Sequence, residues 1–143
     1  MFNNAHTIQD RQNVWRDLRH RSDLTPELIV STIGATQVQH RYLDFYTPDN
    51  WPSVFEIVHD GLFDLTGITL VITTTLAEAG FINSSEVTLD VISNHINGNT
   101  GALLHLDGLL YNIIPGEITP SNQVQDYYTR YDRHIIALDN LLR

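Results

Sequence analysis

The residues of this chain that could do chemistry are histidines, carboxylates and hydroxyl groups, because the sequence contains no cysteine. A cysteine-free chain cannot hold a disulfide framework, a thiolate zinc site or an iron–sulfur cluster, and it has no thiol nucleophile. Seven histidines remain as possible metal ligands. The His-Glu-x-x-His spacing that binds zinc from one helix is not present in the sequence.

The histidines are expected to be too dispersed to share an ion. His95 is expected on the apolar face of a sheet and His105 on the opposite face, because successive strand residues point to opposite sides. His59 and Asp60 are neighbours in sequence and therefore point to different sides of a helix. We therefore expect no metal site and no cofactor.

Catalysis by carboxylates or serines is not favoured either. Asp60 and Asp64 lie four residues apart at an expected helix end, where solvated acids are commoner than an acid–base pair. Ser84, Ser85 and Ser93 flank an expected strand, and no Gly-x-Ser-x-Gly elbow accompanies them. The sequence predicts no catalytic residue, so the chain is not expected to be an enzyme.

The elements that would position these residues start with helices. Thr7 can cap a basic helix over about residues 7–21, and Thr25-Pro26 begins a short helix that stops at Gly34. A third helix is expected from about Ser53 to Gly61. Residues 66–79 are rich in β-branched side chains, yet their length and the following glycine favour a buried helix.

The second half of the sequence predicts strands. Residues 37–46 alternate enough for an edge strand, and an antiparallel meander of three strands follows from Val87, with Ile96 expected opposite Gly101. Its second turn is Asp107-Gly108, which brings Leu106 opposite Leu109. One apolar face is then expected to contain Val87, Leu89, Val91, Ala102, Leu104, Leu106, Leu109, Tyr111 and Ile113.

The C-terminal part completes the expected fold. Pro115-Gly116 and Pro120 are expected to close the sheet, and residues 131–142 to form a short helix or strand. The expected class is α+β, with N-terminal helices and a central buried helix packed on a three- to four-stranded antiparallel meander. At 143 residues, the chain fits a single domain, 1–143.

Charge is distributed unevenly in this acidic chain of net charge −9, whose basic residues are all arginine. Residues 1–21 carry four arginines and two aspartates, whereas residues 42–129 carry eleven carboxylates and no arginine or lysine. The acidic body argues against nucleic acid as the main ligand, and no stretch approaches the ~20 apolar residues of a membrane span. The basic segment points to a charged partner surface or to head-to-tail self-association, although acidity can also serve solubility alone. The expected partner-binding residues are Arg11, Trp15, Arg16, Arg19, Arg21, Asp49 and Trp51.

The order of a helix followed by three antiparallel strands, centred on residues 101–115, resembles the core of transglutaminase-like and papain-like thiol hydrolases. In that family a cysteine opens the helix, a histidine opens the next core strand and an acid ends the following strand. These positions fall near Asp64, near Gly101 or Ala102, and near Ile114 in this sequence. None is a catalytic type, so the resemblance implies a chemically inactive relative whose scaffold is used for contact.

A second resemblance concerns residues 46–58. Trp51-Pro52-Ser53 and Glu56 resemble a Trp-Pro-Ser/Thr-x-x-Glu pattern of small uncharacterised proteins of tailed bacteriophages. The leading hypothesis is a non-enzymatic virion component of the neck, tail or baseplate. It would form an oligomeric assembly with other virion proteins, built in the host cytoplasm.

Two alternatives from other classes stay open. One is an acidic inhibitor that binds a basic site on a host protein, for which the long acidic stretch is the motive. The other is a small hydrolase that uses His59, Asp64, His95 or His105.

Overall fold

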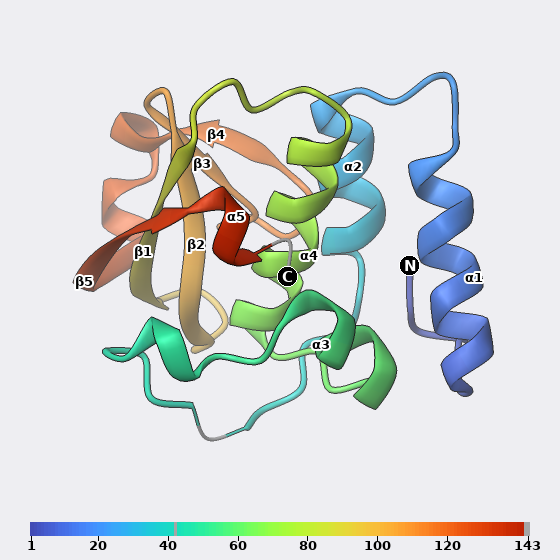
Figure 1. Cartoon of the computed structure of the whole chain (residues 1–143). Coiled ribbons are helices and arrows are strands. Elements are labelled where there is room, and N and C mark those ends of the chain that lie inside the picture. Colours follow the sequence, from blue (N-terminus) through green and yellow to red (C-terminus); the bar gives the residue numbers. More distant parts are fainter. Residues whose placement is uncertain (42, 142–143) are drawn as a thin grey trace.

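A helix that is buried along most of its length lies at the centre of the protein. The computed structural model, which describes residues 1–41 and 43–141, shows this helix, α4 (Leu65–Glu78), between a sheet and the other helices (Figure 1). Residues 65–76 are all buried. The strand β2 (Thr100–Leu106) packs on one side of α4. The helices α2 (Pro26–Gly34) and α3 (Val54–Asp60) also pack against α4. The expected buried helix is confirmed.

The sheet has five antiparallel strands in the order β4-β3-β2-β1-β5. β1 (Glu86–Asn94), β2, β3 (Leu109–Tyr111) and β4 (Ile118–Pro120) follow one another as a meander, and β5 (Tyr128–Ala137) returns beside β1 (Figure 1). The α+β class and the meander are confirmed. Pro115, Gly116 and Pro120 do not close the sheet. β4 follows Pro115 and Gly116, and Pro120 is its last residue, which a strand at the sheet edge tolerates.

Each N-terminal helix begins at the residue that the sequence indicates. The hydroxyl of Thr7 accepts a hydrogen bond from the Asp10 amide at 3.0 Å and opens α1 (Ile8–Arg19). Thr25 caps α2 and Ser53 caps α3 in the same way, at 3.1 and 3.2 Å. A side-chain acceptor at this position satisfies an amide that the helix itself leaves unpaired. Within the described ranges, every helix falls short of the length and hydrophobicity that a membrane crossing requires.

The apolar face of the meander is the expected one. Leu106 pairs with Leu109 as predicted, but Gly101 pairs with Ile92 rather than Ile96. A shift of four residues keeps every side chain on its face, because the strand period is two. The face toward the main core contains Val87, Leu89, Val91, Ala102, Leu104 and Tyr111, with Leu106 and Leu109 partly buried against it. Ile113 instead joins a smaller cluster with Leu65, Ile92, Leu103, Leu110 and Val124.

The predicted edge strand over residues 37–46 is wrong for the described part of that range; Tyr42 lies outside the described residues. This segment runs as a loop under the core, where Val38 and Phe45 pack against buried side chains. The alternating pattern therefore reflects a loop that covers the core, while β5 takes the place beside β1. The segment 131–142 contains both predicted alternatives, the end of β5 and α5 (Leu138–Leu141), and Leu142 lies outside the described residues.

Replacing Leu104 with alanine should lower the free energy of unfolding by about 2–5 kcal/mol, the usual cost of a cavity at a buried leucine. Leu104 is fully buried and pairs with Leu89 on the face that meets the core. Urea denaturation measures the change. Ile96→Ala is the control, because Ile96 is 67% exposed and its loss should change stability by no more than about 0.5 kcal/mol. Equal small costs at both sites would contradict the packing described.

Candidate functional site

The start of α4 and the start of β2 lie in direct contact, as the resemblance to thiol hydrolases requires. Asp64 caps α4, and Leu65 is its first residue. A Cβ atom built on Gly101 of β2 would lie 2.9 Å from Leu65 Cβ and 3.1 Å from the Thr66 amide nitrogen. Real Cβ atoms do not approach so closely, so a side chain at position 101 would force the helix and the strand apart. The close packing therefore requires glycine at position 101, where the resemblance to thiol hydrolases places the histidine.

The third position of the resemblance, expected near Ile114, falls in the turn between β3 and β4. β3 has only three residues and ends at Tyr111, so Asn112 is the residue that follows the strand. Asn112 is buried and has a φ of 77°, and its side-chain oxygen accepts a hydrogen bond from the Gly116 amide at 2.6 Å. An asparagine tolerates this left-handed conformation better than most residues. Its amide therefore shapes the turn between β3 and β4.

A hollow of about 370 Å³ remains beside these positions. Its described lining combines apolar side chains such as Leu65 and Leu103 with four asparagines, and it includes no carboxylate and no imidazole. Asn94, one of the four, donates to the Ile113 carbonyl at 2.9 Å and accepts from the Ile96 amide at 2.8 Å. The described lining offers hydrogen bonds and apolar contact, but no group that exchanges protons near neutral pH.

The prediction that Asp60 and Asp64 share one helix end is wrong. Asp60 is the last residue of α3, and Gly61, with a φ of 69°, turns the chain before Asp64 begins α4. The Asp64 carboxylate accepts from the Gly67 amide at 2.9 Å and lies 3.8 Å from the Arg41 guanidinium. Burial raises the pKa of Asp64 above its ordinary value, against the opposing effects of the Gly67 amide and Arg41.

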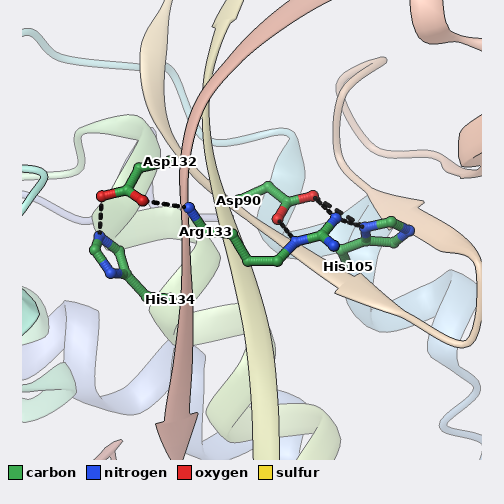
Figure 2. Close-up of polar contacts among 5 residues, drawn as sticks. All are labelled: Asp90, His105, Asp132, Arg133 and His134. Carbon is green, nitrogen blue, oxygen red and sulfur yellow. Dashed lines mark hydrogen bonds and ion pairs between the residues drawn. The ribbon is translucent and has the colours of Figure 1, made fainter.

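A polar network lies on the sheet face turned away from α4, and it was not predicted from the sequence. Asp90 of β1 is fully buried, and its carboxylate accepts from Arg133 Nε of β5 at 2.6 Å and from Arg133 Nη2 at 3.0 Å (Figure 2). Hydrogen bonding to Asp90 raises the pKa of Arg133 above its ordinary value. A carboxylate in the middle of an apolar strand was the available signal, because a buried charge needs a partner. The pair joins β5 to β1.

His105 of β2 completes this network. Its Nδ1 lies 2.9 Å from Asp90 Oδ2 and 3.1 Å from Arg133 Nη2, and these contacts hold the ring in place (Figure 2). A buried acid that orients an imidazole in this way is found in proton-transfer sites. Among the described residues, however, no side-chain hydroxyl hydrogen-bonds to Nε2, so the network holds no activated nucleophile.

The other histidines lie far from this network or serve local contacts. His95 is exposed in the turn after β1, where Nε2 lies 2.7 Å from Thr129 Oγ1, so its predicted place on the apolar face is wrong. His59 pairs with Asp60 at 3.0 Å on the surface. Across residues 1–41 and 43–141, no group of three or more histidines and carboxylates could hold a metal ion.

Two of the expected partner-binding residues lie inside the protein. Arg11 is buried, and its guanidinium donates to the carbonyls of Val58 at 2.7 Å and His59 at 2.6 Å, at the end of α3. Trp15 is also buried, and its Nε1 donates to Thr75 Oγ1 of α4 at 3.0 Å. These side chains hold α1 on the body of the protein, so Arg11 and Trp15 are not exposed to a partner as the sequence had suggested.

The other expected partner-binding residues do not all lie on one surface: Arg16 and Arg19 line one hollow, and Asp49 and Trp51 line another. Arg16 and Arg21 are exposed on or after α1, Arg21 in a two-fold hydrogen bond to Asp23, and Arg19 lies over the Trp15 ring at 3.9 Å. Asp49 is exposed on a short helical turn, η1 (Pro48–Asn50). The Trp51 ring packs edge-on against the His134 ring of β5, with 5.8 Å between the ring centres. Trp51 Nε1 donates to the Asp44 carbonyl at 2.8 Å.

Solved structures show the same fold. Legionella pneumophila LapG in its EGTA-treated form superposes with a TM-score of 0.65 and 14% identity, over 91% of this chain and 77% of that chain. Calcium-bound LapG from the same organism gives 0.62 and 12%, over 92% and 87%. This likeness agrees with the transglutaminase-like and papain-like arrangement expected from the sequence, and it concerns the fold alone. No protein-family model and no curated protein sequence matches the chain.

Asp64→Asn should raise the free energy of unfolding near neutral pH and have no such effect in acid. Asparagine keeps the helix cap, while the variant avoids the cost of a buried charge. Because the pKa of Asp64 is raised in the native protein, the wild-type native state binds this proton more tightly than the unfolded chain does. Its contribution to stability therefore falls as pH rises through that pKa.

Denaturant unfolding of both proteins at neutral pH, and at a pH below the ordinary aspartate value of 3.8, measures this difference. The variant's advantage should shrink as pH falls, since the wild-type carboxyl becomes protonated. A variant that is less stable than wild type at neutral pH would mean that the contacts of the Asp64 carboxylate with Gly67 and Arg41 outweigh its burial.

Proposed function

We propose that this protein is a non-enzymatic component of a tailed bacteriophage particle and acts through protein–protein contacts. The observation that carries the proposal is the close packing of Gly101 on the start of α4, which leaves no room for a larger side chain where the resemblance to thiol hydrolases places the histidine. The other two positions of the resemblance fall near Asp64 and Ile114, neither of which is the residue type that the family uses there, and this favours contact over catalysis.

The phage assignment rests on the resemblance of residues 46–58 and on the charge distribution. Asp49 and Trp51 of that segment lie at a hollow of about 560 Å³ between η1, α3, β5 and α5. The exposed Arg16 of α1 is opposite in sign to the body of the chain, which carries eleven carboxylates over residues 42–129. Such complementary charges guide assembly between neighbouring subunits. The neck, tail or baseplate is the proposed place, with other virion proteins as partners and assembly in the host cytoplasm.

A mass-spectrometric inventory of purified particles tests the virion assignment. The chain should copurify with the particles in a constant ratio to known structural proteins through a density gradient. A phage enzyme that acts only inside the infected cell is the control, since it should be lost during purification. Loss of this chain together with the control would reject the assignment.

The alternative of an acidic inhibitor is motivated by the eleven carboxylates of residues 42–129. Affinity purification from infected and uninfected cells distinguishes it from the virion assignment. A virion component should recover phage proteins and only from infected cells, whereas an inhibitor should recover one basic host protein from both.

The hydrolase alternative is favoured by one observation, the His105 imidazole oriented by buried Asp90. Alanine substitution of His59, Asp64, His95 and His105, one at a time, tests it by phage growth. Unchanged growth in all four variants would remove this alternative. A loss confined to His105→Ala, with the variant still folded, would favour it over the contact function.

Association through the exposed arginines of α1 should weaken as salt rises. Charges on the surface are screened over about 8–10 Å at physiological ionic strength, so an interface guided by Arg16 depends on salt. Sedimentation of the protein with its purified partner at low and high sodium chloride measures the effect. Affinity that does not change with salt would point to an apolar interface instead.

A further inference from the structure

The surface between α1 and α3 is hollowed over about 240 Å³. We call this hollow the α1–α3 groove. The residues that matter for its chemistry are Asn13, Trp15, Arg16 and Arg19 of α1 and Phe55 and Val58 of α3. Its volume is below the roughly 300–1,000 Å³ of pockets that enclose small molecules. It has room for one large side chain of a partner.

The floor of the groove is apolar and includes an aromatic ring that the core does not use. Phe55 is 51% exposed and lies 5.8 Å from Trp15, ring centre to ring centre, at a tilt of 59°. α3 turns Val54, Ile57 and Val58 inward, which leaves Phe55 on the outer side of the helix. Half-exposed aromatic side chains beside arginines are typical of residues that contribute most to protein binding.

The rim of the groove is cationic. The Arg16 side chain is 53% exposed, and Arg19 lies flat over the Trp15 ring, 3.5 Å from Glu78 Oε2. Arg19 Nε is buried and finds no hydrogen-bond acceptor among the described residues. This atom has almost no accessible surface, so it is not available to a partner.

The charge of the side chains that line the groove indicates what kind of partner it can bind. The groove's described lining includes two arginines and no carboxylate, in a chain of net charge −9; beside the groove, Asp17 lies 4.0 Å from Arg16 and Glu78 lies 3.5 Å from Arg19. Both ion pairs are partly exposed and therefore weak, so a carboxylate of a partner can compete for the guanidinium groups. A basic segment would meet Arg16 and Arg19 as like charges, whereas a carboxylate can accept hydrogen bonds from a guanidinium. We propose that the α1–α3 groove binds an acidic segment of another protein, which inserts one aromatic or aliphatic side chain against Phe55, next to the buried Trp15. This inference rests on the proposed contact function and names the partner's chemistry.

NMR titration with synthetic peptides tests the groove directly. The probe is a peptide with one phenylalanine flanked on both sides by aspartates; one control peptide has alanine for the phenylalanine, and another has lysines for the aspartates. The chain has two tryptophans, so two indole N–H signals report separately, and Trp51→Phe assigns them. The probe should shift the Trp15 signal saturably and leave the Trp51 signal in place. The alanine peptide should bind more weakly, and the lysine peptide should not bind.

Variants at exposed positions test the same site without disturbing the core. Arg16→Glu and Phe55→Ala should each weaken binding of the probe by about tenfold, a common effect of removing a central interface residue. Arg130→Glu is the matched control, because it reverses one exposed charge on β5, on the side of the molecule away from α1 (Figure 1). It should leave the affinity nearly unchanged.

Several results would overturn the inference. These are the absence of a saturable shift at Trp15, an equal loss of affinity in Arg130→Glu and Arg16→Glu, or sedimentation showing that a second copy of the chain fills the groove. The particle inventory described above is independent of all three. A chain present in particles but inert toward the probe would reject the groove and leave the virion assignment standing.

Discussion

Residues 65–76 of α4 are all buried, so the polar side chains of this helix lie away from water, where an unpaired group is costly. Three of its five buried threonines find partners among the described residues, whereas Thr69 Oγ1 and Thr74 Oγ1 find none. The Thr66 hydroxyl accepts from the Ala102 amide of β2, the Thr75 hydroxyl accepts from Trp15 of α1, and the Thr73 hydroxyl donates within the helix. The position of the sheet and the position of α1 are therefore both tied to α4.

This enclosure affects both the start of the helix and the side that faces α1. At the beginning of α4, close packing of Leu65 and Thr66 on β2 requires Gly101 and leaves no space for a reacting side chain. On the side of α1, Trp15 turns inward to Thr75, and Arg19 covers its ring. Phe55 and Arg16 stay exposed beside this contact, and both line the α1–α3 groove.

Local features could be predicted from the sequence because they depend on neighbouring residues. The caps Thr7 and Thr25 and the tight turn at Asp107-Gly108 each act over a few positions, and the structure has them where expected. Features that join distant segments could not be predicted. Asp90 and Arg133 are 43 residues apart, and β5 pairs with β1 through a register shift that no local pattern indicates. The buried Arg11 and Trp15 escaped for the same reason, since their partners belong to α3 and α4.

Photo-crosslinking from position 55 during phage assembly tests the central claim, that this fold serves contact through the α1–α3 groove, most directly. Phe55 is replaced by a photoreactive phenylalanine analogue, and infected cells are irradiated before the particles are purified. The account predicts a covalent adduct within the particles between this chain and an acidic segment of another structural protein. Adducts found only with a basic host protein, or none in particles that contain the chain, would contradict it.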